Sequence, residues 1–289
     1  MKKRLLLLML LLSGIAEAQI VNIPDPAFRL LLLNADAALN HVAKNSAGQW
    51  VAIDVNNDNE IQAAEAAAIH ELYIDDDDGI FSIQGIEGFY NLRSLFIMFC
   101  DNLQALDATA LTHLEYLKID SCYNIETLNL SNLSNLESLT IDHCNDFPYT
   151  NVTGLQNLKH LHLLSTSTSI AFTQLPALET LYLFHYEHSV DLSNCLNLQS
   201  FSADDGHLGA VTFGNKPFLN VLTLTPMIYN APLDISGCTA LSYLRVIINY
   251  DYNEEIMFVK LKNGVYDYEH IDVRINAGTE NMVYICVDE

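Results

Sequence analysis

A hydrophobic pattern with a fixed period constrains the fold of this 289-residue chain more than any other feature. The order Leu-x-x-Leu-x-(Leu/Ile/Val) recurs about every 20 to 23 residues between Ile69 and Val246. A repeat of this length predicts a solenoid, in which each coil packs against its neighbours and the stack exposes one long surface. The nine registers are Ile69/Leu72/Ile74, Leu92/Leu95/Ile97, Leu114/Leu117/Ile119, Leu136/Leu139/Ile141, Leu158/Leu161/Leu163, Leu178/Leu181/Leu183, Leu198/Phe201/Ala203, Leu219/Leu222/Leu224 and Leu241/Leu244/Val246.

The alternation inside each register predicts a short strand. Positions one, four and six are apolar and point inward, whereas positions three, five and seven point outward. The segments between strands are rich in Asn, Asp, Ser and Gly and lack a helical period, so they are expected to form turns. The predicted fold is therefore an α/β-type repeat solenoid with a parallel β-sheet on its concave face. Its return segments are mostly non-helical, and it has a small helical N-terminal cap and a β C-terminal cap.

The two ends of the chain predict export and capping. Lys2, Lys3 and Arg4 precede an apolar run from Leu5 to Leu12 and the small-residue site Ala16-Glu17-Ala18, a pattern typical of a signal peptide at residues 1–18. An uncleaved N-terminal anchor is the alternative. No later segment has the 18 or more apolar residues of a membrane helix. We expect a cap at 19–68, about nine repeats at 69–250 and a C-terminal β cap at 251–289.

The charge balance excludes one class of partner. The chain has 13 Lys and Arg against 36 Asp and Glu, a formal net charge of −23. Such a chain repels phosphate backbones, so nucleic acid is excluded as a partner. We expect a monomer that is secreted or displayed on the cell surface.

Three cysteines occupy the same place in successive repeats: Cys100, Cys122 and Cys144. An exported protein can form disulfides, but a ladder of equivalent positions also suits small buried thiols that donate weakly to the turn. We favour buried thiols, with disulfides as the alternative.

One loop before the repeats predicts a metal site. Asp54 to Glu65 has oxygen-bearing residues at the positions that ligate calcium in an EF-hand loop. Asn59 replaces the usual glycine at position six, and asparagine tolerates the left-handed conformation required there. We expect structural Ca²⁺ binding, with a metal-free loop that only shapes the cap as the alternative. The predicted ligands are Asp54, Asn56, Asp58, Glu60 (through its backbone carbonyl) and Glu65. Helices are expected at 26–34 and 65–69 on either side.

Outward positions predict a contact surface. Aromatic and apolar residues gather on two parts of the concave face, and such exposed clusters mark binding sites. The alternative is that aromatic residues simply favour strands. The first predicted cluster is His160, His162, Leu164, Tyr182 and Phe184, and the second is Tyr73, Phe96 and Tyr116.

Catalytic motifs are missing from the sequence. It contains no Gly-x-Ser-x-Gly, no glycine-rich phosphate loop and no zinc motif, and the scattered histidines near His185 do not form one. The predicted protein is therefore not an enzyme, and a hydrolase that uses surface carboxylates is the least favoured alternative.

Residues outside the leucine positions add a family resemblance. They include Ile23-Pro24-Asp25 with Phe28, the loop Asp54 to Glu65, Gly85-Ile86-Glu87-Gly88-Phe89-Tyr90-Asn91-Leu92, Leu128-Asn129-Leu130-Ser131, Asp191-Leu192-Ser193-Asn194-Cys195, Leu261-Lys262-Asn263-Gly264 and Tyr284-Ile285-Cys286-Val287-Asp288. Over nearly the whole mature length the chain resembles internalin-like leucine-rich-repeat proteins secreted by Bacteroidetes such as flavobacteria. The resemblance implies that the last element closes the stack. Members often continue into a C-terminal sorting domain, whereas this sequence stops at Glu289; we expect either a product released without that domain or a truncated reading frame.

These expectations combine into a function. We expect an exported, non-enzymatic binding or adhesion module whose concave sheet contacts a protein. A surface polysaccharide is the alternative ligand, because exposed Tyr and Phe rings also stack on sugars.

Overall fold

The computed structural model describes residues 19–75, 79–144, 150–166, 168–226, 228–229, 231–249, 257–265, 269–276 and 283–286. The predicted signal peptide and Asp76 to Asp78 lie outside the described residues. Helical elements are few: α2 (Pro26–Leu33), α3 (Ala63–Ala66) and the 3₁₀ turns η1 (Ile86–Gly88) and η2 (Phe172–Gln174).

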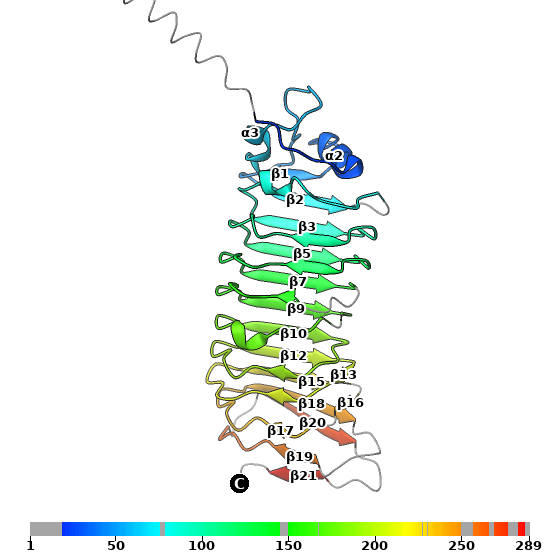
Figure 1. Ribbon diagram of the computed structural model, residues 1–289. Coiled ribbons are helices and arrows are strands. Elements are labelled where there is room, and N and C mark those ends of the chain that lie inside the picture. The colour runs from blue at the N-terminus through cyan, green and yellow to red at the C-terminus, as the bar shows by residue number, and fades with distance from the viewer. Residues whose placement is uncertain are drawn as a thin grey trace, which may run out of the picture.

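Eleven strands form one long sheet along the stack (Figure 1). Each of the nine predicted registers contributes one strand, from β2 to β18, and neighbours from β2 to β20 pair in parallel. The predicted solenoid is thus confirmed. In spatial order the strands are β1 (Ala43–Asn45), β2 (Ile69–Asp75), β3 (Ser94–Met98), β5 (Tyr116–Asp120), β7 (Ser138–Asp142), β9 (His160–Leu164), β10 (Thr180–Phe184), β12 (Ser200–Asp204), β15 (Val221–Thr225), β18 (Tyr243–Asn249) and β20 (His270–Asn276).

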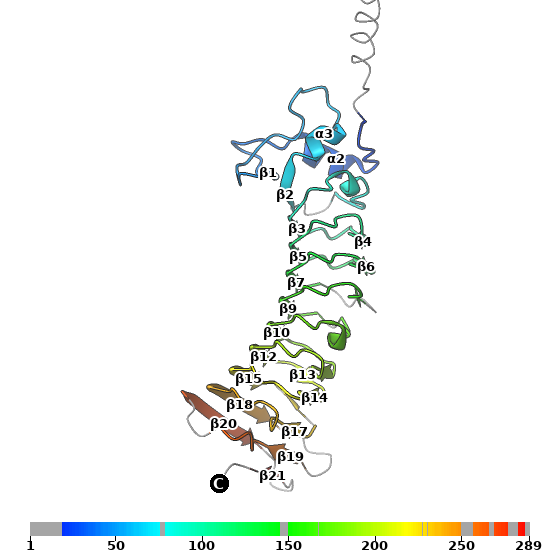
Figure 2. The same cartoon turned by 90° about the vertical axis from the view of Figure 1, so that its left-hand side faces the viewer.

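The return segments form turns and short strands on the opposite side (Figure 2). In the described residues they contain no α-helix, as the sequence predicted. The stack bends toward the side of the long sheet, which makes that face concave. The short strands are β4 (Ala105–Asp107), β6 (Thr127–Asn129), β8 (Thr150–Asn151), β11 (Val190–Asp191), β13 (His207–Leu208), β14 (Val211–Thr212), β16 (Ile228–Tyr229), β17 (Leu233–Asp234), β19 (Met257–Lys260) and β21 (Val283–Cys286).

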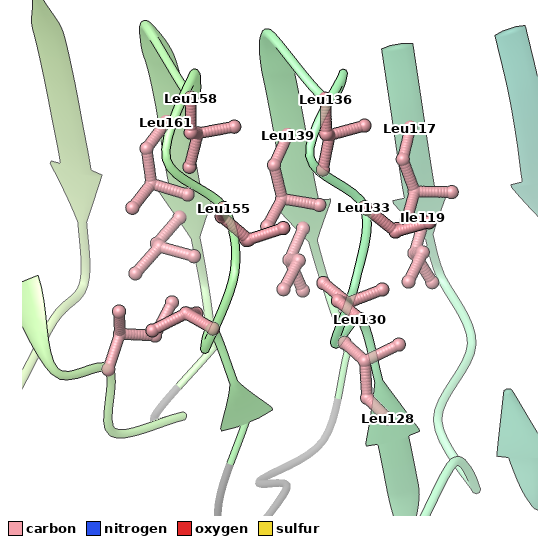
Figure 3. Packing of buried hydrophobic residues seen from close by; sticks show 14 of the residues in the cluster. Leu117, Ile119, Leu128, Leu130, Leu133, Leu136, Leu139, Leu155, Leu158 and Leu161 are labelled. Carbon is pink, nitrogen blue, oxygen red and sulfur yellow. The ribbon is translucent and has the colours of Figure 1, made fainter. Parts of the chain in front are cut away.

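The core is a stack of leucine layers between the two faces (Figure 3). Leu117, Leu139 and Leu161 lie opposite one another on β5, β7 and β9, and each is fully buried. Leu136 and Leu158, which precede the same strands, are also fully buried. Because every layer touches only the layers above and below, the sequence period fixes which residues meet.

A left-handed turn follows most strands of the long sheet. Phe99, Ser121 and His143 have φ of 54°, 53° and 45°, a region that costs a non-glycine residue roughly 1 kcal/mol. The next residue in each case is a ladder cysteine, whose Sγ donates to the carbonyl two residues earlier at 3.2 to 3.4 Å. Cys100, Cys122 and Cys144 are buried thiols, as the sequence predicted.

The N-terminal cap differs from the prediction in one helix and one strand. Helix α2 matches its prediction closely, but α3 occupies Ala63–Ala66 and not 65–69. It ends early because Ile69 already starts β2, and it starts early because Glu65 accepts a hydrogen bond from the backbone N–H of Gln62. Sequence analysis did not predict β1, which pairs antiparallel with β2 and covers the edge of the sheet.

Asp25 holds the cap to the first coil. Its Oδ1 accepts from the N–H groups of Ala27 and Phe28 and so caps α2. Its Oδ2 accepts from the N–H groups of Phe81 and Ser82 at 2.9 and 3.0 Å, more than 50 residues along the chain. One buried carboxylate therefore satisfies four backbone donors from two separate segments.

Candidate functional site

The outward side chains of the long sheet form the candidate recognition surface. Strands β3, β5, β7, β9, β10 and β12 all alternate half-buried and fully buried residues, and the half-buried ones are the predicted positions three, five and seven. All eight predicted contact residues lie on this face. The two predicted clusters are separated by β7, which carries the small side chains of Ser138 and Thr140.

The N-terminal cluster is a column of stacked rings. Tyr73 and Phe96 lie opposite each other on β2 and β3, and their rings stack with centroids 4.3 Å apart and planes 5° from parallel. Tyr116 continues the column diagonally, 5.1 Å from Phe96 at an angle of 38°. The strand register brings these three side chains together, because position five of one coil meets position five or three of the next.

The cap extends this column beyond the predicted residues. Trp50 packs 5.0 Å from Tyr73, and His41 stacks on Trp50 at 4.6 Å. We call His41, Trp50, Tyr73, Phe96 and Tyr116 the aromatic stripe. Sequence analysis missed His41 and Trp50 because only the pairing of β1 with β2 places them beside the first coil. Trp50 is the sole tryptophan of the chain, and that rarity was its one signal.

Lys44 on β1 fastens the stripe to the cap. Its Nζ lies 2.8 Å from Glu71 Oε2 and 3.0 Å from the hydroxyl of Tyr73. The same ammonium is 4.5 Å from the Trp50 ring centroid and 5.0 Å from that of Tyr73, within the range of a cation–π contact. The hydrogen bonds that Lys44 donates to Glu71 and Tyr73 raise the pKa of Lys44, so the amine stays charged.

A pocket of about 360 Å³ opens beside the stripe, where the cap meets the sheet. Its lining includes Leu31 and Val42 of the cap, Tyr73 and Met98 of the sheet, and the exposed Asp75. Asp75 and Met98 are direct neighbours in the strand register.

The central cluster is packed differently. His162 meets the Tyr182 ring edge-on, with planes 89° apart and centroids separated by 6.0 Å. His160 Nδ1 lies 2.8 Å from the hydroxyl of Thr180. Burial, followed by the charge of His160, lowers the pKa of His162 and favours its neutral form. On its other side Tyr182 lies opposite Ser202, whose side chain is too small to cover a ring.

Leu164 and Phe184 complete the central cluster. They lie opposite each other on β9 and β10, and both are half-buried. Phe184 stacks on His185 at 4.4 Å, and His185 in turn is 2.8 Å from a carboxylate oxygen of Asp205.

The predicted calcium loop is held in shape by hydrogen bonds from its own backbone to its acidic side chains. Asp54 Oδ1 and Oδ2 accept from the N–H groups of Asp58 and Asn59, and Asn59 has the left-handed φ of 63° expected at position six. The buried Glu65 accepts from the N–H groups of Val55 and Gln62 and so closes the loop from its last position. The bond from Val55 to Glu65 brings the last position of the loop back to its start.

The donor set of the loop fits a hard cation. Asn56 and Gln62 each place a side-chain amide nitrogen 2.9 Å from Asp58 Oδ2, and the two amide groups lie 3.2 Å apart. Asn56 Oδ1 accepts from the N–H of Asp58 at 2.9 Å, which fixes the orientation of that amide, whereas an amide flip of Gln62 would turn its oxygen toward Asp58. Sequence analysis missed Gln62, which stands at position nine of the loop. A hydrogen bond from the Glu60 N–H lowers the pKa of Asp58, so this carboxylate is ionised at neutral pH.

A second group of potential ligands lies on the sheet itself. One ligand atom each from Asp120, Asp142 and His143 falls within a 4.8 Å cluster. Two of these groups are already paired, because Lys118 Nζ lies 2.8 Å from Asp120 and His143 Nδ1 lies 2.7 Å from Asp142. This arrangement is a network of surface ion pairs.

The fold and this face define a leucine-rich-repeat solenoid with one long parallel sheet. Within the described residues, no helix has the length and apolar content needed to cross a membrane. No protein-family model and no curated protein matches the chain.

Solved structures include distant neighbours of this fold. Internalin C2 from Listeria monocytogenes is 20% identical and aligns with 82% of this chain and 92% of its own, with a TM-score of 0.43. Internalin InlF from the same species is 16% identical over 86% of each chain, with a TM-score of 0.35. A plant ice-binding protein is 16% identical over 63% of this chain and 73% of its own, with a TM-score of 0.38. These values carry no argument about function, and none of these structures bears on the predicted likeness to Bacteroidetes proteins.

Proposed function

We propose that this protein is an exported, non-enzymatic recognition module whose concave sheet face contacts a protein. The observation that carries the proposal is the clustering of half-buried aromatic side chains on a rigid sheet. Partly exposed aromatic residues are enriched where proteins bind one another, because they bury a large area at a low cost in conformational entropy. The sheet holds each ring at a fixed register, so the surface is organised before a partner arrives.

A protein ligand and a polysaccharide ligand make different demands on these rings. A sugar stacks on the free face of an aromatic ring, whereas a protein side chain can also pack against ring edges. In the central cluster, Tyr182 has small Ser202 beside it, and this geometry favours a polysaccharide as the second candidate ligand. Export is supported by the basic and apolar N-terminal sequence.

The test uses the central cluster and the opposite face together. Wild-type protein and the double variant Tyr182→Ser, Phe184→Ser are applied to an array of cell-surface proteins and to a glycan array. Leu196→Ser, which changes an exposed residue on the return side, serves as the control. Protein binding that depends on the sheet variants supports the proposal, and glycan binding alone supports the alternative. If only Leu196→Ser removes binding, the binding site does not lie on the sheet.

We further propose that the loop from Asp54 to Glu65 holds a structural calcium ion. Asp54, Asn56, Asp58 and Glu65 would supply side-chain oxygens, Gln62 would join them after an amide flip, and Glu60 would offer its carbonyl. Calcium would supply the positive charge that these close carboxylates otherwise lack. Its role would be to hold the cap against the first coil, because Arg29 of α2 already donates to the carbonyl of Asn59 in the same loop at 2.7 Å.

A further inference from the structure

The aromatic stripe and its neighbouring pocket restrict what kind of ligand can bind at the N-terminal end of the sheet. Tyr73 lies between Trp50 and Phe96, and Phe96 lies between Tyr73 and Tyr116. Trp50 in turn contacts His41 on one side and Tyr73 on the other. The faces of these three rings are therefore covered by other rings. What they offer to a ligand is their edges, which do not stack on a sugar.

The edges of stacked rings form an apolar ridge that suits protein side chains. Ring edges carry partial positive charge and pack well against aliphatic and aromatic groups. The half-buried Met98 lies next to Phe96 along the same strand and extends this apolar surface toward the pocket. The stripe thus has the geometry of a protein contact.

The pocket favours a ligand group with a positive charge. Its walls combine apolar groups of Leu31, Tyr73 and Met98 with the carboxylate of the exposed Asp75. A long cationic side chain fits this combination, because its methylene groups can lie on the apolar wall while its head group reaches the carboxylate.

The negative net charge of the whole chain also favours a basic partner. With a formal net charge of −23, the protein attracts basic surfaces over distances of about one Debye length, roughly 10 Å at moderate salt. Asp120 and Asp142 continue the row of Asp75 along the sheet at position seven. A partner approaching the stripe therefore meets the exposed Asp75 beside the apolar ridge, whereas Asp120 and Asp142 are paired with Lys118 and His143.

We propose that the aromatic stripe and the adjoining pocket bind a basic segment of a partner protein, with an arginine or lysine side chain of the partner in the pocket and its apolar neighbours on the ring edges. The inference rests on the proposed recognition function and assigns it a site and a partner chemistry. Half of the site comes from the cap, so the cap is part of the binding surface as well as the end of the stack.

The test uses Trp50 as a built-in reporter. Because it is the only tryptophan, tryptophan emission excited selectively over that of tyrosine reports on the stripe alone. A phage-displayed library of random dodecapeptides is selected against the full mature chain, and the selected peptides are synthesised and titrated by fluorescence and by calorimetry. Cellohexaose and laminarihexaose are titrated in parallel. We expect selected peptides to contain Arg or Lys beside a large apolar residue and to change the Trp50 emission on binding.

Four variants locate the site. Asp75→Asn keeps the shape of the pocket and should weaken binding roughly fivefold. Phe96→Ser interrupts the apolar ridge and should weaken it at least about tenfold. Leu196→Ser, which changes an exposed residue outside both clusters, is the control and should leave affinity unchanged. Phe184→Ser shows whether the central cluster takes part in binding the peptide. Circular dichroism and the melting temperature show whether each variant is folded, and Asp75→Asn decides the result if Phe96→Ser is not.

The possible outcomes separate this inference from the proposed function. Peptide binding that leaves Trp50 unchanged and is lost in Phe184→Ser would overturn the stripe as the site while leaving protein recognition by the sheet in place. Binding of a hexasaccharide at Trp50 without peptide binding would overturn the protein partner. Peptides selected without basic residues, and equally bound by Asp75→Asn, would refute the role of the pocket. If neither peptides nor saccharides bind in calorimetry, both this inference and the recognition function fail.

Discussion

Asn in place of Asp25 is expected to loosen the junction between the cap and the first coil. The carboxylate is buried and accepts four backbone hydrogen bonds, two on each oxygen, at 2.9 to 3.0 Å. Asn keeps one oxygen and turns an NH₂ group toward the other pair of N–H donors. The N–H groups of Phe81 and Ser82 are part-buried, and each that loses its acceptor costs about 1 to 2 kcal/mol, so the variant should lose roughly 2 to 4 kcal/mol.

The consequence for thermal stability follows from chain length. For a chain of this size, 1 kcal/mol corresponds to a shift of about 2 to 4 °C in melting temperature, so a loss of roughly 5 to 15 °C is expected. Calorimetry measures the shift, and hydrogen exchange shows whether the amides of Ala27, Phe28, Phe81 and Ser82 become exposed. Ala is the second substitution, since it removes all four acceptor contacts and should cost more than Asn.

At acidic pH the wild type and Asp25→Asn should become equally stable. Burial raises the pKa of Asp25, but the bonds from Phe28, Phe81, Ser82 and Ala27 together lower it below its ordinary value. A lowered folded-state pKa means that the stabilisation is present above about pH 4, the unfolded value, and is lost as pH falls through the folded value. A melting temperature within about 1 °C of wild type for Asp25→Asn at neutral pH, with unchanged exchange, would refute this account.

Three further predictions concern the metal, a buried amine and the core. A chelator should lower the melting temperature of wild type and not of Asp54→Ala, because only the intact loop binds calcium; equal curves with and without chelator would contradict this. Burial lowers the pKa of Lys216, so between its folded value and about 10.5 the wild type gains stability as pH rises. Lys216→Met should therefore stabilise the chain by about 1 to 2 kcal/mol at neutral pH in denaturant titrations, and the gain should shrink toward pH 10; a loss at neutral pH would speak against it. Leu139→Ala should cost about 2 to 5 kcal/mol in the same assay, because Leu139 is fully buried between Leu117 and Leu161; a change under about 1 kcal/mol would be inconsistent with a packed layer.

The sequence predicted the repeats well because the residues that contact one another in a solenoid are one repeat apart in the chain. Leu95, Leu117 and Leu139 meet since each is one period from the next, and no other information is needed. Tyr73 and Phe96 followed from the same register. The ladder cysteines were also predictable, because their shared position implied a shared environment.

The cap was less predictable because its contacts do not follow the period. The pairing of Ala43 with Leu72 and the bonds from Asp25 to Phe81 and Ser82 join segments with no common spacing. Trp50 and His41 therefore entered the site only with the structure. In the calcium loop, spacing identified the residues at ligand positions one, three, five and twelve, but Gln62 was overlooked because glutamine at position nine has no distinctive pattern.

The central claim is that the concave sheet face is the recognition surface, and a blocking label tests it most directly. In a Cys286→Ser background, which removes the exposed thiol, Ser138→Cys and Ser134→Cys are labelled with a polyethylene glycol maleimide. Ser138 points outward from β7 between the two clusters, and Ser134 is exposed on the return side of the same coil. The account predicts that the label on Ser138→Cys abolishes binding of the peptide selected on the wild-type protein, and that the label on Ser134→Cys does not. Equal binding by both labelled proteins would contradict it.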